Sequence, residues 1–134
     1  MILEVKNLSK FYQQEKGIFK QGSTKIAALE NLNFTQEEFT TLGIAGESGS
    51  GKTTLAKLIL SLISPSCGSI KFNPLIITCL RKDVQIIFQN PYSSLDPKMR
   101  IIGMLSEPLI IHKIAQKRQI KDKVAELLNL VGLD

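Results

Sequence analysis

Several residue types are scarce in this chain, which has no tryptophan, one histidine and two cysteines. Cys67 and Cys79 form no CxxC pair and have no histidine nearby. This excludes a disulfide-stabilised miniprotein and predicts reduced, partly buried thiols of a cytosolic protein. No apolar run reaches the roughly 18 residues that span a bilayer. The N-terminal residues alternate in polarity and include Glu4, unlike a secretory signal peptide.

Long runs of like charge are also missing. The 134 residues include 17 Lys and Arg against 12 Asp and Glu, a net charge of +5, and the basic residues are scattered. With only 6% aromatic residues in addition, nucleic acid is not an expected partner. The length and the 43% hydrophobic content favour one soluble, intracellular globular domain with its own core.

Hydrophobic periodicity predicts strands in the first part of the chain. Residues 2–8 alternate apolar and polar, as in a strand, and residues 13–25 are polar with two glycines, as in a loop. Residues 25–34 are expected to form two short strands around a turn at Glu30 and Asn31. Three further strands are predicted over residues 39–45, 69–72 and 84–88. Residues 39–45 are expected to form a buried strand, and residues 84–88 a central one.

Helical periodicity appears after the glycine-rich region and again at the end of the chain. Residues 52–63 place apolar side chains three and four positions apart, and Pro65 and Gly68 end this pattern. Two helices are expected after Pro97, over residues 101–111 and 116–131, and Gly132 is expected to stop the second one. The predicted order is therefore strands first and helices last.

The segment from Gly46 to Thr53 matches the phosphate-binding pattern G-x-x-x-x-G-K-[ST]. Glycines let such a loop adopt positive φ angles and bring backbone N–H groups against phosphate oxygens. The loop is followed by a predicted helix, whose N-terminus attracts anions. Lys52 is expected to reach the β- and γ-phosphates, and the Thr53 hydroxyl to ligate Mg²⁺. A Gly-Ser surface loop is the alternative, which the flanking strand and helix patterns disfavour.

The phosphate loop alone does not distinguish GTPases, small kinases and transport ATPases. Residues 1–12, the loop GESGSGKTT and the segment FQNPYSSLDP at residues 88–97 together resemble the ATP-binding subunit of ABC transporters. More narrowly, they look like the subunits of bacterial oligopeptide, dipeptide and nickel importers. The resemblance extends to LLNLVGLD at residues 127–134.

The resemblance implies roles for individual residues. Tyr12 matches the aromatic residue that stacks on adenine, with Phe11 as the competing candidate. Gln89 matches the glutamine that senses Mg²⁺ and the attacking water, so Thr53 and Gln89 are the implied metal ligands. The implied nucleotide-binding residues are Tyr12, Gly46, Glu47, Ser48, Gly49, Ser50, Gly51, Lys52, Thr53, Thr54 and Gln89.

The resemblance also implies an α/β fold, the N-terminal portion of an ABC-type P-loop NTPase. Residues 1–90 would be part of the ATP-binding core, and residues 91–134 the start of the helical subdomain, where residues 91–97 meet the membrane-spanning partner. The implied cofactors are ATP and Mg²⁺. The implied partners are permease subunits and a second ATP-binding subunit, at the cytoplasmic face of the cell membrane.

The sequence departs from the family in its catalytic half. It contains no LSGGQ signature and no apolar run ending in Asp-Glu, so the second Mg²⁺ ligand and the general base are missing. Two hypotheses remain: the N-terminal half of an importer's ATP-binding subunit, or a non-hydrolysing nucleotide-binding or docking module from a split or degraded gene. A GTPase or small-molecule kinase is disfavoured, because the sequence has no NKxD string and no Arg-rich lid.

Overall fold

A computed structural model describes residues 1–15, 23–90 and 95–133, which divide into two compact units. The first unit is Met1–Ile86 and the second is Ile87–Asp134. Strands dominate the first unit and helices make up the second, as the periodicity predicted. Within the described ranges, no helix has the length and apolar character needed to cross a membrane.

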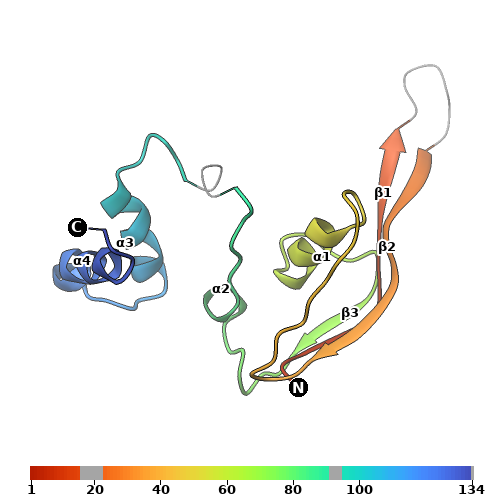
Figure 1. Cartoon of the computed structure of the whole chain (residues 1–134), viewed down its shortest axis with the longest axis horizontal. Helices are drawn as coiled ribbons and strands as arrows, with labels where there is room; N and C mark the ends of the chain where they lie inside the picture. The colour runs from red at the N-terminus through yellow and green to blue at the C-terminus, as the bar shows by residue number, and fades with distance from the viewer. Residues whose placement is uncertain (16–22, 91–94, 134) are drawn as a thin grey trace. The chain divides into compact units, whose positions relative to one another are not determined.

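The first unit is built on a three-stranded sheet with the order β2-β1-β3 (Figure 1). Strand β1 (Leu3–Glu15) lies in the middle and pairs antiparallel with β2 (Ser23–Gln36) on one side and β3 (Cys67–Phe72) on the other. The predicted loop over residues 13–25 is wrong where it is described, because strand pairing continues to Glu15 and resumes at Ser23. Residues 16–22 of that prediction lie outside the described residues. The two short strands expected within residues 25–34 form one continuous strand.

Irregularities in β1 interrupt its alternating pattern. The register with β2 shifts three times between Val5 and Phe11, and Asn7 adopts a left-handed φ of 49°. The Asn7 N–H donates a hydrogen bond to Asn33 Oδ1 on β2 (2.8 Å), so the bulged residue keeps a partner. Despite the shifts, Leu3, Val5 and Leu8 are all buried. The bulges therefore adjust the spacing along β1 so that its apolar side chains all point into one core.

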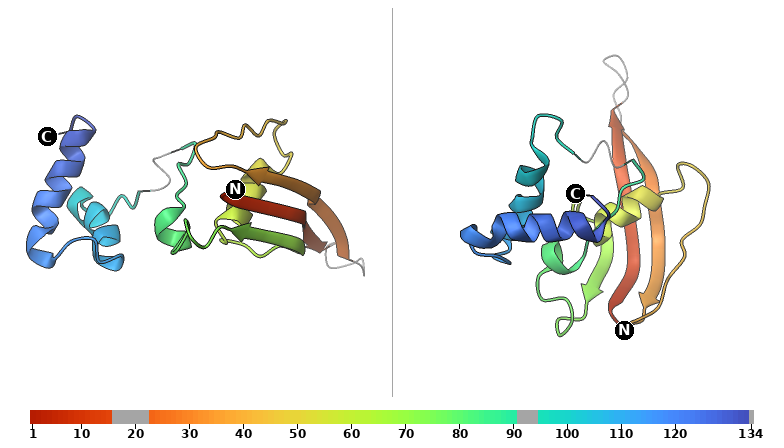
Figure 2. Two further views of the ribbon diagram at one scale, coloured as in Figure 1. Left: turned by 90° about the horizontal axis from the view of Figure 1, so that it is seen from below. Right: turned by 60° about the vertical axis from the view of Figure 1, so that its left-hand side comes forward.

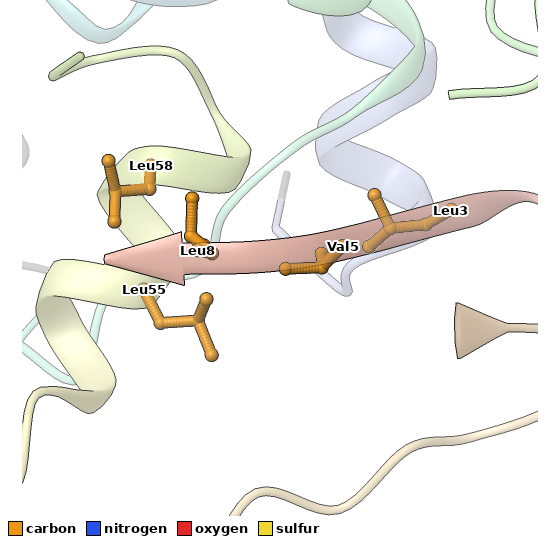
Figure 3. Packing of buried hydrophobic residues seen from close by; sticks show 5 residues of the cluster. All are labelled: Leu3, Val5, Leu8, Leu55 and Leu58. Carbon is orange, nitrogen blue, oxygen red and sulfur yellow. The ribbon is translucent and has the colours of Figure 1, made fainter. Parts of the chain in front are cut away.

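Helix α1 (Lys52–Ile59) lies against one face of this sheet (Figure 2). Its apolar residues are spaced three apart, which places Leu55 and Leu58 on one helix face. Figure 3 shows these two leucines beside Leu8, with Val5 and Leu3 following along β1. Leu8, Leu58 and Val5 have the most deeply buried side chains of the described residues. This cluster fixes the helix, and with it the glycine-rich loop that precedes it, on the sheet.

Two predicted strands are absent from the sheet. Residues 39–45 and 84–88 have no regular structure, and Phe39, Leu42 and Ile44 are exposed. A run of apolar residues becomes a central strand only when neighbouring strands accept and donate its backbone hydrogen bonds. The three described strands pair only with one another, so both segments remain irregular. The prediction of buried strands at these positions is wrong for this structure.

A short helix, α2 (Leu80–Asp83), follows β3 in the first unit. The Asp83 carboxylate accepts hydrogen bonds from the backbone N–H groups of Cys79 and Thr78 (both 2.8 Å) and from the Thr78 hydroxyl (3.2 Å). The bond from Cys79, followed by those from Thr78, holds the pKa of Asp83 below its usual range. Cys67 and Cys79 are both free thiols and both exposed. The expected partial burial is wrong, because each cysteine stands at the end of an element rather than inside the core.

The described part of the second unit contains two α-helices, α3 (Ile101–Ile111) and α4 (Ile120–Leu130), and a 3-10 turn, Lys117–Gln119, that leads into α4. Its core consists of Leu109, Ile120 and Val124. The predicted helix over residues 101–111 is confirmed. The second helix starts later than predicted, because a capping box between Gln116 and Gln119 holds the first turn in the tighter 3-10 form.

All three longer helices end in the same hydrogen-bonding pattern. In α4, the N–H of Gly132 donates to Asn129 O and that of Leu133 to Leu128 O, with Gly132 at a φ of 75°. These two bonds define a Schellman motif, so Gly132 is the predicted helix stop. The corresponding left-handed residue is Ser61 after α1 and Lys113 after α3, each at a φ of 53°. Two of the three helix stops are therefore made without glycine.

Candidate functional site

The candidate phosphate loop, residues 46–51, joins the irregular segment 39–45 to α1. The Ser50 N–H donates to Glu47 O (3.2 Å), which closes a turn, and Gly49 and Gly51 have φ angles of 83° and 93°. Glycine adopts these positive φ angles at the lowest cost in free energy, because it has no Cβ atom to clash with the backbone. The loop therefore has the curled backbone that its sequence predicts.

Gly51 also lies close against the sheet. A Cβ atom at this position would lie 2.3 Å from the carbonyl oxygen of Ala28 and 2.8 Å from a methyl carbon of Leu29. Real Cβ atoms do not come this close to backbone oxygen, so only glycine fits. The end of the phosphate loop is thus held directly on β2.

The helix that follows offers backbone donors to an anion. Gly51 is the N-cap of α1, it provides no side-chain cap, and no acidic residue lies in the first turn. The first helical bond runs from the Leu55 N–H to Gly51 O (2.9 Å). The backbone N–H groups of the first turn thus have no intrahelical partner, and the helix dipole adds partial positive charge. Such a helix start binds phosphate in many proteins.

Lys52 supplies a full positive charge at the same place. Its Nζ donates to the carbonyl oxygens of Gly46 (2.7 Å) and Glu47 (2.6 Å) and approaches Ser50 Oγ at 3.3 Å. The side chain therefore folds back over the loop instead of extending into solvent. The ammonium group thus stabilises the curled loop through the loop's own oxygens.

Thr53 and Thr54 follow on the first turn of α1. The Thr53 side chain is exposed and Thr54 is half-buried. A threonine hydroxyl fits Mg²⁺, which takes oxygen ligands and usually keeps several waters and substrate phosphates in its shell. Among the described residues, no cluster of three or more His, Cys, Asp or Glu side chains could hold a metal. A hydroxyl at the start of α1 is compatible with a Mg²⁺ ion that keeps phosphate and water oxygens in its shell.

The candidate adenine-stacking residue lies on β1 in the same unit. Tyr12 is 45% exposed, whereas the alternative candidate, Phe11, is half-buried. Tyr12 pairs with Ile26 on β2, two positions along that strand from the Ala28 carbonyl that meets Gly51. Of the two aromatics, Tyr12 thus has the accessible ring.

An apolar cavity of about 410 Å³ lies beside the phosphate loop. One wall comes from β2, a second from residues 42–45, and a third from Ser50, Lys52 and Leu55. This cavity could not be predicted from the sequence, because the apolar run of residues 39–45 predicted a packed strand. The apolar side chains of that segment line the cavity instead.

Gln89 belongs to the second unit, where it is exposed. Its proposed part in binding Mg²⁺ stays a prediction. Residues 91–94 of the segment expected to meet a membrane-spanning partner lie outside the described residues. Within the described part of that segment, Asp96 Oδ1 accepts a hydrogen bond from the Lys98 N–H (2.9 Å) and forms a turn.

One residue at this site was not singled out from the sequence. The Nζ of Lys10 lies 5.4 Å from the centroid of the Tyr12 ring. The available signal was the i, i+2 spacing of the two residues on one strand. The spacing alone does not predict this contact, because bulges in β1 change which face of the sheet each side chain is on.

Comparisons with known proteins agree with this geometry. The chain is 36% identical over 140 residues to the di/tripeptide transport ATP-binding protein DppF of Pseudomonas aeruginosa, covering 98% of this chain and 43% of that protein. It is 33% identical over 141 residues to the oligopeptide transport ATP-binding protein AppF of Bacillus subtilis, again covering 98% and 43%. The chain thus spans less than half the length of these relatives.

Among solved structures, the fold is similar to the dimeric ATP-binding cassette MJ0796 in a post-hydrolysis state bound to ADP and Pi. The TM-score is 0.74 at 26% identity, over 99% of this chain and 58% of that one. The predicted α/β, ABC ATPase-like fold of an N-terminal portion is confirmed by this likeness. Residues 29–134 match the ABC transporter family. The phosphate loop, its position on β2 and these relationships together show that the chain belongs to the ABC transporter family.

Proposed function

We propose that this chain binds ATP with Mg²⁺ as part of the ATP-binding component of a peptide importer. The observation that carries the proposal is the phosphate loop: Gly51 is seated on β2, and Lys52 holds its charge over the loop at the start of α1. The relatives named for peptide transport support the class of importer. The oligopeptide and dipeptide class is thus favoured over nickel.

Each part of the nucleotide has a proposed partner. The N–H groups at residues 46–54 and the Lys52 ammonium would hold the phosphates, and the Thr53 hydroxyl and the Gln89 amide would complete the Mg²⁺ shell. The Tyr12 ring would stack on the base. Because stacking is tolerant of base identity, ATP and GTP should bind similarly.

The larger assembly is also part of the proposal. Residues 1–90 would belong to the ATP-binding core and residues 91–134 to the start of the helical subdomain. The partners would be permease subunits and a second ATP-binding subunit, on the cytoplasmic face of the membrane. The dimeric state of the structural relative supports the second ATP-binding subunit.

A second candidate is a nucleotide-binding or transporter-docking module that does not hydrolyse ATP. The observation that favours it is that the 134 residues contain no LSGGQ signature and no apolar run ending in Asp-Glu, so these residues by themselves do not complete a hydrolytic site. Phosphoryl transfer to water requires a positioned nucleophile as well as metal and charge clamps. The residues proposed above would provide the charge clamp and two Mg²⁺ ligands but no positioned base.

The test of nucleotide binding is calorimetric titration of Mg²⁺-ATP into the chain and into Lys52→Ala. The substitution removes the cation from the loop and should abolish binding. Lys57→Ala is the matched control, because it removes an exposed lysine from the last turn of the same helix. Equal affinities in all three proteins would overturn the site assignment.

A further inference from the structure

Lys10 and Tyr12 form a cation–π pair on β1. The Lys10 Nζ lies 5.4 Å from the centroid of the tyrosine ring, within the range in which an ammonium group is attracted to a ring face. Tyr12 nevertheless remains 45% exposed. The pair therefore leaves much of the aromatic side chain accessible to a ligand.

Lys10 is fixed by a second, independent contact. Its Nζ donates a hydrogen bond of 2.7 Å to the carbonyl oxygen of Ser64, which lies in the connection between α1 and β3. Because the same ammonium group donates a hydrogen bond and faces an aromatic ring, the Lys10 side chain rotates less freely than an unattached surface lysine. Through it, the Tyr12 ring is tied to the segment that follows α1.

The pair lies close to the phosphate loop. Lys10 pairs across the sheet with Leu29, and Leu29 and Ala28 are the residues that Gly51 meets. The loop, the β2 residues on which it rests and the Lys10–Tyr12 pair therefore occupy one region of the first unit. Lys10 itself lies outside the phosphate-loop motif.

We propose that Lys10 is a positioning residue for the nucleotide base: it holds the Tyr12 ring in the orientation that accepts a stacked base. This inference rests on the proposed nucleotide-binding function. Lys10 would contribute by reducing the freedom that the Tyr12 ring loses when a base binds, not by touching the phosphates.

The experiment compares ATP with tripolyphosphate, which has the phosphates and no base, by calorimetry on the full chain. Lys10→Met keeps the aliphatic stem and loses the charge, and should weaken Mg²⁺-ATP binding about two- to five-fold. Tripolyphosphate binding should not change. Lys10→Arg, which keeps a cation and donor, should restore ATP affinity. Lys71→Met on β3 is the control for loss of an exposed lysine.

A second measurement tests the pair without any nucleotide. In the unaltered chain, the Lys10 Cε protons should resonate upfield because of the ring current of Tyr12, and Tyr12→Leu should remove this shift. If the upfield shift is absent, the pairing is overturned directly.

The remaining outcomes separate the two proposals. Unchanged ATP binding in Lys10→Met, together with a loss in Tyr12→Ala, would overturn the role of Lys10 and leave the proposed function standing. An equal loss of ATP and tripolyphosphate binding would make Lys10 a phosphate contact and overturn its positioning role. If the unaltered chain binds neither probe, the proposed function fails and this inference fails with it.

Discussion

At the scale of single residues, Gly49 and Gly51 share a backbone requirement but differ in their surroundings. Both have positive φ angles, yet a Cβ atom at Gly49 would meet nothing within 4 Å, while one at Gly51 would overlap the Ala28 carbonyl. The two positions therefore separate the conformational role of a loop glycine from its packing role.

Substituting each glycine by alanine should give different losses of stability. Gly49→Ala should lower the free energy of unfolding by about 1–2 kcal/mol, the usual cost of a left-handed non-glycine residue. Gly51→Ala should cost clearly more, because the loop must also move away from β2, and it should weaken ATP binding. Urea unfolding measures both variants. Equal losses would show that Gly51 does not need its close contact.

How far the sequence could predict the site depends on how far apart in the chain the contacting residues lie. The phosphate loop was predictable, because its turn, its helix start and Lys52 are contiguous in the chain. The role of Gly51 against Ala28 and the contact of Lys10 with Ser64 were not. Both depend on which strands and turns become neighbours, and the contact of Lys10 with Ser64 spans 54 positions.

At the scale of elements, the helix ends at Ser61 and Lys113 are suboptimal. Each residue takes the left-handed position that glycine takes after α4. Ser61→Gly and Lys113→Gly should each raise the free energy of unfolding, by up to about 1 kcal/mol. The control is Ala125→Gly in the middle of α4, which should lower stability by about 1 kcal/mol. Thermal unfolding checks the signs, and destabilisation by Lys113→Gly would contradict the assigned motif.

Asp83 gives the turn before α2 a dependence on pH. Its pKa is held low by the N–H groups of Cys79 and Thr78, so the folded state favours the ionised carboxylate. The stabilisation is fully present above the ordinary aspartate pKa of about 3.9 and is lost as the pH falls through the depressed value. Asp83→Asn should therefore reduce stability near neutral pH, and the difference from the unaltered chain should shrink in acid. Urea unfolding at several pH values tests this, and a difference independent of pH would contradict it.

The strands show where sequence patterns stop being sufficient. The helices α3 and α4 were predictable, because a helix satisfies its backbone hydrogen bonds locally. Residues 39–45 have an equally strong apolar pattern, but a strand also needs a partner, and the described sheet provides none for them. The opposite error occurred at the end of β1, where polar residues up to Glu15 pair with β2 because backbone pairing does not require apolar side chains.

At the scale of the whole molecule, we expect this chain alone to show no ATP hydrolysis above background. Glu47 lies within the loop, and Asp96, the first acidic residue after Gln89, lies in a turn. Neither is placed as a general base, and loss of a base typically costs about 10²–10⁴-fold in rate. Steady-state phosphate release is the measurement. Adding a C-terminal half that carries LSGGQ and the Asp-Glu pair should restore turnover, if the halves assemble.

The outcome that would contradict this expectation is specific. Turnover near that of a complete ATPase, lost in Lys52→Ala, would mean that a base is present among these residues. The chain would then hydrolyse ATP by an arrangement other than the one that the family resemblance implies.

The central position of β1 has a consequence for the order of folding. The first strand of the chain can pair with β2 as soon as a hairpin forms, but its other edge must wait for β3, after the phosphate loop and α1 have been synthesised. Closing that longer loop is the slower, non-local step. The phosphate loop can rest on β2 once α1 forms, but the core beneath α1 is complete only when Ile70 and Phe72 of β3 join it. Until then Leu3, Val5 and Leu8 are incompletely covered, so we expect a newly made chain to expose apolar side chains to proteases and chaperones before its first unit is complete.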